Sequence, residues 1–435
     1  MFSRIKRALW GDITNDELKE FGLLSVAFSF IIGAYWMLRL IKNSTFMHLV
    51  GPENMPYAKM VSLVSLLLIV LFYNKLVDWF EKTKLIYMIT TFYGTLFLVS
   101  AYLLSQSSAG IGVLPGWLNN GVGWAFYVAV ESLGSLVVVL FWSFVASSVD
   151  TASAKRGYPI IFFGGQIGSL LGTSLLAMLA SLLGIPFLTC VAAGALLAVP
   201  FVIKIYTTKH TRVAVASGVE EKKRTTSIVE GIKLIFTHRY LMGILVVSTV
   251  YDIISFLFEY QMNSAAHATL GDLGKVTSFL GVYGMVVNTT SLLFVLLGTS
   301  FVIRRFGLAA CLVAYPVGIA CLVTYTWMFP SLWALMITVV GVKALSYVLN
   351  NPCKEILYIP TSKDVKFKAK SWIDVQGTRS AKTTGAIIAT MFSSLSTLLV
   401  FSSVLSLGII AVWIPIAFFV GKKNQELVDS GTIIQ

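Results

Sequence analysis

Charged side chains recur inside the long apolar runs of this sequence. Arg39 and Lys42 lie one helical turn apart at the end of the first run, and Glu131, Glu259 and Lys343 interrupt later runs. A charge in the interior of a bilayer costs several kcal/mol, so such residues usually mark a transport pathway or an ion site. These residues are therefore the first candidates for function.

Four of the runs carry their polar residues on one helical face, because the steps are mostly three, four or seven residues. The four stripes contain Ser25, Ser29, Tyr35, Arg39 and Lys42, then Tyr127, Glu131 and Ser135, then Asp252, Ser255, Glu259 and Asn263, then Lys343, Tyr347, Asn350 and Lys354. A simpler explanation is that these polar groups pair with neighbouring helices, and we favour it for Tyr127, Ser25, Ser29 and Ser135. We favour a function for Arg39, Lys42, Glu131, Glu259 and Lys343.

Cations outnumber acids at the membrane-embedded positions. The cations are Arg39, Lys42, Lys59, Lys343, Lys354, Arg379 and Lys382, and the acids are Glu131, Asp252, Glu259, Glu355 and Asp374. Arginine and lysine are the usual ligands of phosphate, so this surplus predicts an anionic cargo. The carboxylates are expected to pair with the cations when the cargo is absent. Lys59 and Lys275 are equally well explained by ammonium groups that reach the headgroups.

The composition predicts an all-α polytopic membrane protein with a lipid bilayer as its partner. The chain of 435 residues is 57% hydrophobic and only 12% charged, with a mean hydropathy of +0.82, whereas a soluble protein has about 25% charged residues. Runs of about twenty apolar residues are long enough to span a bilayer. We expect twelve spans, at 18–41, 57–77, 85–105, 123–149, 158–182, 185–206, 239–261, 276–300, 307–329, 331–358, 370–394 and 397–420.

A polar segment divides these spans into two sets of six. We expect an N-terminal bundle at 1–206, a cytoplasmic loop at 207–238 and a C-terminal bundle at 239–435. Most of the 33 lysines and arginines then lie on one side, which places both termini in the cytoplasm. The net charge of +13 is spread over many short loops, so nucleic-acid binding is the poorer explanation of it.

The two halves share an internal pattern. The first span ends Arg39-x3-Asn43 and the seventh ends Glu259-x3-Asn263, while the fifth and eleventh carry small residues four apart, at Gly164, Gly168 and Gly172 and at Gly377, Ala381 and Gly385. Small residues at this spacing allow close helix packing. A duplicated six-helix unit with a cytoplasmic central loop is the major-facilitator-type layout, which places the site between the halves.

The segment 350–386 resembles the non-mitochondrial ATP/ADP translocase family of plastids and obligate intracellular bacteria. The similarity is carried by Cys353-Lys354-Glu355, Tyr358-Ile359-Pro360, Lys366-x-Lys368-x-Lys370, Ile373-Asp374-Val375 and Arg379-x2-Lys382, and by Arg39-x2-Lys42 and the stretches from Glu131 and Ala154. The resemblance implies an antiporter of ATP and ADP, or an importer of other nucleotides, sometimes with protons. It also implies roles for Lys42, Glu131, Glu259 and the basic residues from Lys354 to Lys382.

The sequence departs from the family at two positions that leave the substrate open. Asn43 stands where the family has an acid, and Thr383-Thr384-Gly385 stands where it has Ser-Gly-Gly. The sequence contains no GxxxxGK[ST] phosphate loop, so a nucleotide would be cargo and not fuel. The scattered cysteines and histidines suggest neither a disulfide nor a metal centre, and we expect no cofactor.

Our main hypothesis is a monomeric nucleotide exchanger in a bacterial inner membrane, whose two bundles rock around a central site. The candidate phosphate ligands are Lys42, Lys343, Lys354, Arg379 and Lys382, and Tyr347 or Tyr127 is a candidate to stack on the base. Arg39 and Glu259 are expected to form an outer gate, and Lys370 and Asp374 a cytoplasmic one. One alternative is proton-coupled import of nucleotides or other organic phosphates, with Glu131 or Glu259 as the proton site. Another is a membrane enzyme or receptor, which would gather its charges at one interface.

The outer gate predicts the outcome of a charge exchange. Arg39→Glu places two acids at the gate, so we expect it to abolish nucleotide exchange in proteoliposomes. Addition of Glu259→Arg restores opposite charges and is expected to restore part of the exchange. A double variant that is folded but shows no recovery would rule out the gate.

Overall fold

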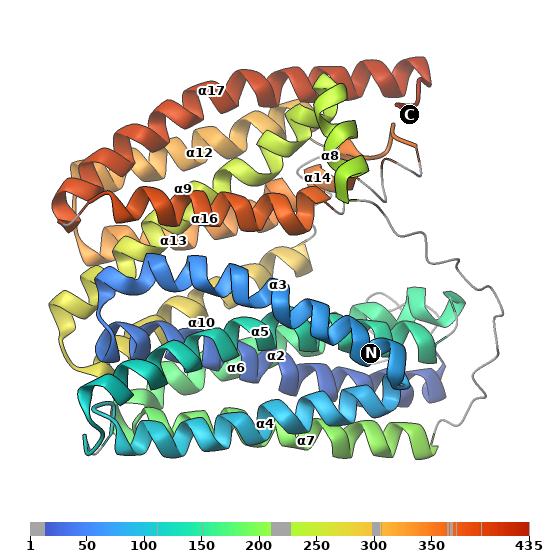
Figure 1. Cartoon of the computed structure of the whole chain (residues 1–435). Helices are drawn as coiled ribbons and strands as arrows, with labels where there is room; N and C mark the ends of the chain where they lie inside the picture. The colour runs from blue at the N-terminus through green and yellow to red at the C-terminus, as the bar shows by residue number, and fades with distance from the viewer. Residues whose placement is uncertain are drawn as a thin grey trace. The chain divides into compact units, whose positions relative to one another are not determined.

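The computed structural model describes residues 14–110, 112–149, 151–209, 228–297, 305, 307–362, 365, 369–370, 372–392 and 394–434. Its helices are α2 (Asn15–Leu49), α3 (Met55–Trp79), α4 (Lys82–Gln106), α5 (Gly116–Ser148), α6 (Thr151–Leu183), α7 (Ile185–Lys209), α8 (Ile228–Thr237), α9 (Arg239–Leu270), α10 (Leu273–Leu297), α12 (Leu308–Met328), α13 (Leu332–Leu345), α14 (Asn351–Leu357), α16 (Thr378–Thr390) and α17 (Leu395–Ser430), shown in Figure 1. The short turns η1 (Pro52–Asn54), η2 (Ser346–Asn350) and η4 (Ile373–Gly377) join some of them.

The all-α membrane class is confirmed. Eleven helices of the described residues are long and apolar enough to cross a membrane, and each corresponds to a predicted span. The remaining prediction, 370–394, falls on the π-helical turn η4 followed by the 13 residues of α16. This segment carries Lys370, Asp374, Arg379 and Lys382. Because of these charges, its described residues do not form a long apolar helix of the kind found at the other predicted spans. Lys366 and Lys368 lie outside the described residues.

The chain folds into two compact units. The first comprises Met1–Val219 and His267–Asn288, and the second comprises Glu220–Ala266 and Thr289–Gln435. The first part of α10 thus belongs to the unit built from the N-terminal helices, where the buried Thr277 hydroxyl donates to Ser44 at 2.7 Å. A Cβ at Gly281 would lie 2.4 Å from the backbone nitrogen of Ala177, so α10 closely approaches α6. The division of the chain into bundles at 1–206 and 239–435, with a loop at 207–238, stays a prediction.

In the first unit, α2 packs against α5, α6 and α7 (Figure 1). The start of α2 is held by a capping box, in which Thr14 accepts from the Glu17 amide at 3.2 Å and Glu17 accepts from the Thr14 amide at 2.9 Å. The other carboxylate oxygen of the buried Glu17 accepts hydrogen bonds from Ser153 and Arg156 of α6. These contacts join the amino-terminal ends of α2 and α6.

Small residues bring α6 very close to α2, as their spacing predicts. A Cβ at Gly168 would lie 2.1 Å from the carbonyl oxygen of Ser29, and one at Gly172 would lie 2.6 Å from that of Gly33. The second unit uses the equivalent device, because a Cβ at Gly385 of α16 would lie 3.1 Å from the carbonyl oxygen of Ile253 in α9. In each unit a stripe-bearing helix therefore packs against a helix with small residues at four-residue spacing.

The close approach predicts the effect of added methyl groups. Gly168→Ala is expected to push α2 and α6 apart and to destabilise the fold by about 1–3 kcal/mol, measured as a lower unfolding midpoint in detergent. Gly194→Ala on α7 is the matched control, since a Cβ there meets nothing within 4 Å. Gly194→Ala should be neutral or stabilising by about 0.5–1 kcal/mol. Equal midpoints for the two variants would contradict the close packing.

Candidate functional site

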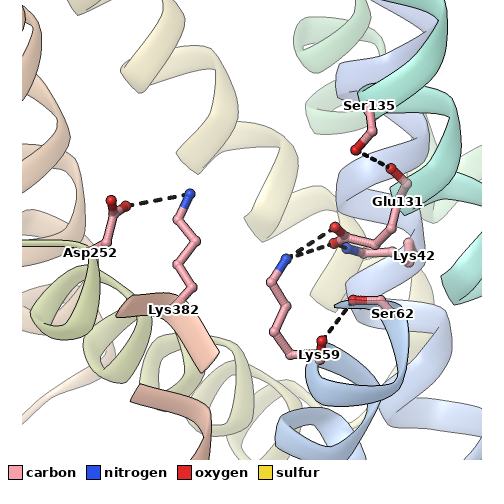
Figure 2. Close-up of polar contacts among 7 residues, drawn as sticks. All are labelled: Lys42, Lys59, Ser62, Glu131, Ser135, Asp252 and Lys382. Carbon is pink, nitrogen blue, oxygen red and sulfur yellow. Dashed lines mark hydrogen bonds and ion pairs between the residues drawn. The ribbon is translucent and has the colours of Figure 1, made fainter. Parts of the chain in front are cut away.

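The first unit joins Lys42 of α2, Lys59 of α3 and Glu131 of α5 in one ion cluster (Figure 2). The Lys42 ammonium donates to Glu131 Oε1 at 2.5 Å. The Lys59 ammonium donates to both carboxylate oxygens, at 3.2 Å to Oε1 and 3.0 Å to Oε2. One carboxylate is therefore shared by two lysines.

The local structure positions Lys42 from two sides. Its side chain is only 5% exposed, and its ammonium lies 4.2 Å from the ring centroid of Tyr127. Tyr127 lies one turn before Glu131 on α5 and packs against Phe46 of α2. A desolvated ammonium over an aromatic face is attracted to the ring quadrupole. Tyr127, considered from the sequence as a base-stacking residue, here supports the cation.

Charges in this cluster do not cancel. Two ammonium groups share one carboxylate, and the side chains of Lys59 and Glu131 are 23% and 18% exposed. The cluster therefore carries one unbalanced positive charge in a partly desolvated place, where an oxyanion interacts more strongly than in water. Lys59 was counted from the sequence among the embedded cations but not among the candidate phosphate ligands. Its signal was a lysine at the start of an apolar run, a place where lysines also reach for headgroups.

In the second unit the two acids of α9 are paired with lysines as well. The Lys343 ammonium of α13 donates to Glu259 Oε2 of α9 at 2.9 Å. The Lys382 ammonium of α16 lies 3.4 Å from Asp252 Oδ1, also of α9 (Figure 2). Carboxylates that the sequence places inside the membrane thus pair with lysines in both units.

Two π-helical turns interrupt the segments that carry the basic residues of the second unit. The first, η2, contains Tyr347 and joins α13, which carries Lys343, to α14, which carries Lys354. The second, η4, precedes α16 with its half-buried Arg379 and Lys382. Turns of this kind are frequently found at functional sites. They widen the helix locally, so the regular spacing assumed for the stripe is not kept through Tyr347.

The remaining basic residues have separate neighbours. The buried Lys354 has its ammonium 5.7 Å from the ring centroid of Tyr251. Lys370 donates to both oxygens of Glu355, at 2.9 and 2.6 Å, while Asp374 is exposed on η4. The role of Lys370 and Asp374 in a cytoplasmic gate stays a prediction.

The outer gate also stays a prediction. The half-buried Arg39 belongs to the first unit, where its guanidinium lies 5.0 Å from the ring centroid of Trp36. Glu259 belongs to the second unit and pairs with Lys343.

Sequence comparison extends these observations to known proteins. The profile described as TLC ATP/ADP transporter matches residues 1–111, 117–332 and 319–424. The chain belongs to this family. It is similar to ADP,ATP carrier protein 3 of Rickettsia prowazekii, with 21% identity over 98% of each chain. It is also similar to ADP,ATP carrier protein 4 of Rickettsia felis, with 22% identity over 90% of this chain and 87% of the relative. The family resemblance found in the sequence is confirmed, and the protein is a nucleotide exchange transporter.

Solved structures confirm the major-facilitator-type fold. The nucleoside transporter NupG matches with a TM-score of 0.65 at 12% identity, over 91% of this chain and 98% of NupG. A bacterial homologue of the iron transporter ferroportin matches with a TM-score of 0.66 at 9% identity, over 93% and 99% of the two chains. Identities this low carry information about the fold alone.

The Lys42–Glu131 contact predicts a thermodynamic coupling. Glu131→Gln leaves two lysines without their partner and is expected to destabilise the protein by about 3–5 kcal/mol. The double variant Glu131→Gln with Lys42→Gln should lose less free energy of unfolding than the two single variants together. The difference is a coupling free energy of about 1–3 kcal/mol. Unfolding of the four proteins of this cycle in detergent measures the coupling.

The exposed pair of Lys423 and Glu426, whose side chains are 43% and 51% exposed, provides the control cycle. It should show little coupling, because solvent screens exposed pairs. Additive effects at Lys42 and Glu131 would contradict the buried pair.

Proposed function

We propose that this protein exchanges ATP for ADP across a bacterial inner membrane, with both termini in the cytoplasm, and that its lysine–carboxylate pairs are the unloaded form of its phosphate sites. The observation that carries the proposal is Glu131 shared between Lys42 and Lys59, at 2.5 to 3.2 Å. A carboxylate and a phosphate present similar oxygens to an ammonium group. A nucleotide phosphate can therefore replace the carboxylate on the same lysines.

The charge of this cluster supports binding of an anion. Unloaded, Lys42, Lys59 and Glu131 together carry one net positive charge. A polyphosphate brings several negative charges, and it can engage one lysine while the other remains with Glu131. The carboxylate then does not lose all of its compensation, which limits the free-energy cost of the replacement.

The same charge favours exchange over one-way transport. A carrier that returns empty must take an unbalanced cation through a closed state that excludes water, which costs several kcal/mol. A carrier that returns with a nucleotide has this charge neutralised by phosphate. Internal ADP is therefore expected to accelerate the uptake of external ATP.

We assign phosphate binding in the second unit to Lys343, Lys354, Arg379 and Lys382. Lys343 and Lys382 have their carboxylate partners on α9, so the logic of the first unit applies to both. Tyr347, half-buried in η2 between Lys343 and Lys354, is our candidate for contact with the base. A flat aromatic ring provides stacking without selecting one base.

Uptake into proteoliposomes tests both the exchange and the role of Lys59. Labelled ATP should enter wild-type liposomes preloaded with ADP much faster than empty ones. Lys59→Gln should lower uptake at limiting ATP by about 10- to 100-fold, since a hydrogen bond to a charged group contributes about 1.5–3 kcal/mol. Lys59→Arg should restore part of the loss.

The control is Lys75→Gln, which removes an exposed lysine from the same helix α3. It should transport as the wild type does. Uptake that ignores internal nucleotide would contradict exchange, and equal losses at Lys59 and Lys75 would remove Lys59 from the site.

A further inference from the structure

Of the three acids that α5 and α9 carry, Glu131, Asp252 and Glu259, Asp252 has the weakest compensation in the described part of the chain. Its side chain is 3% exposed in the middle of α9, and Oδ1 lies 3.4 Å from the Lys382 ammonium. Within the described residues, Oδ2 has no hydrogen-bond partner. A buried polar atom without a partner is rare and calls for an explanation such as a missing ligand.

The other two membrane acids are compensated better. Glu131 is held by two lysines at 2.5 to 3.2 Å, and its side chain is 18% exposed. Glu259 receives a 2.9 Å hydrogen bond from Lys343, and its side chain is 17% exposed. Asp252 is more deeply buried than either, and its contact with lysine is longer.

The groups around Asp252 come from several helices of the second unit. Lys382 on α16, Lys354 on α14 and Lys343 on α13 act on it electrostatically. Tyr251 on α9 and Tyr315 on α12 also interact with it. Lys354 is directed to the Tyr251 ring, at 5.7 Å, and Lys343 to Glu259. The direct ion pair of Asp252 is therefore the one with Lys382.

The Lys382 ammonium is also able to move away from the Asp252 carboxylate. The Lys382 side chain is 44% exposed, whereas that of Asp252 is 3% exposed. A phosphate that engages Lys382 from the exposed side draws the ammonium away from the carboxylate. An ionised carboxylate left without its close partner in a desolvated place costs several kcal/mol, and protonation removes that cost.

We propose that Asp252 is a proton-binding site linked to nucleotide binding, so that the protein takes up one proton from water when a phosphate engages Lys382. The carboxylate of Asp252 becomes a neutral carboxylic acid, and Lys382 keeps its proton and its charge. Release of the phosphate returns Lys382 to Asp252, which gives the proton back to water. The inference rests on the proposed function, because it needs a phosphate on Lys382. It assigns the proton to Asp252, whereas the alternative of proton-coupled import assigns it to Glu131 or Glu259.

Calorimetric titration measures the linked proton. Purified full-length protein in lipid nanodiscs is titrated with ADP at about pH 8, where the terminal phosphate is fully ionised. Buffers with different heats of ionisation separate proton uptake from the heat of binding. The wild type should take up about one proton per nucleotide, and its Kd should rise about tenfold per pH unit above neutrality.

Three variants distinguish Asp252 from other groups. Asp252→Asn carries the neutral form permanently, so it should bind ADP without linked proton uptake and with a Kd that changes little with pH. Asp252→Glu keeps a carboxylate at this position, so it should still take up a proton when ADP binds. Asp16→Asn, at an acid whose side chain is 91% exposed, should behave as the wild type does.

A further variant keeps the inference testable if Asp252→Asn fails to fold. Lys382→Gln leaves Asp252 without its ion pair before any ligand binds, so the carboxylate is already protonated. This variant should bind ADP more weakly and take up no proton. Proton uptake that persists in Asp252→Asn or Lys382→Gln, or that is absent from the wild type, would overturn the inference. Absence of any ADP binding by the wild type would instead overturn the proposed function.

Discussion

Nucleotide exchange, as proposed here, depends on the sharing of Glu131 between Lys42 and Lys59. Three helices, α2, α3 and α5, each contribute one charged group to it. None of these charges would be stable alone in an apolar interior, and together they form a cluster that still lacks one negative charge. A site of this kind is held together when empty and remains attractive to an anion.

Close packing of α2 against α6 supports this cluster. The glycines of α6 allow α2 to approach until their backbones are in contact, which holds in place the helix that carries Lys42. The capping box and the contacts of Glu17 with Ser153 and Arg156 join these two helices near their amino-terminal ends. In the second unit α16 approaches α9 in the same way, and it brings Lys382 to Asp252.

The sequence predicted the features that follow from periodicity and composition, which include the membrane class, the positions of most spans, the polar stripes and the small-residue faces of α6 and α16. It could not predict which cations meet which acids, because a helical stripe specifies a face and not a partner. Lys59 and Asp252 gained importance only through three-dimensional contacts. The turns at Ser346–Asn350 and Ile373–Gly377 break the regular period that sequence reasoning assumes. The packing of α10 with the first unit depends on contacts with α2 and α6 far along the chain.

A structure of the full-length protein with bound nucleotide would show whether phosphate replaces the carboxylate, through the distance between Lys42 Nζ and the Glu131 carboxylate. In the present structure the ammonium lies 2.5 Å from Oε1. With ADP bound, we predict that a phosphate oxygen lies within hydrogen-bonding distance of Lys42 or Lys59 and that Glu131 has lost at least one of its contacts with these lysines. A bound nucleotide whose phosphates lie elsewhere, with all three contacts of Glu131 intact, would contradict the account.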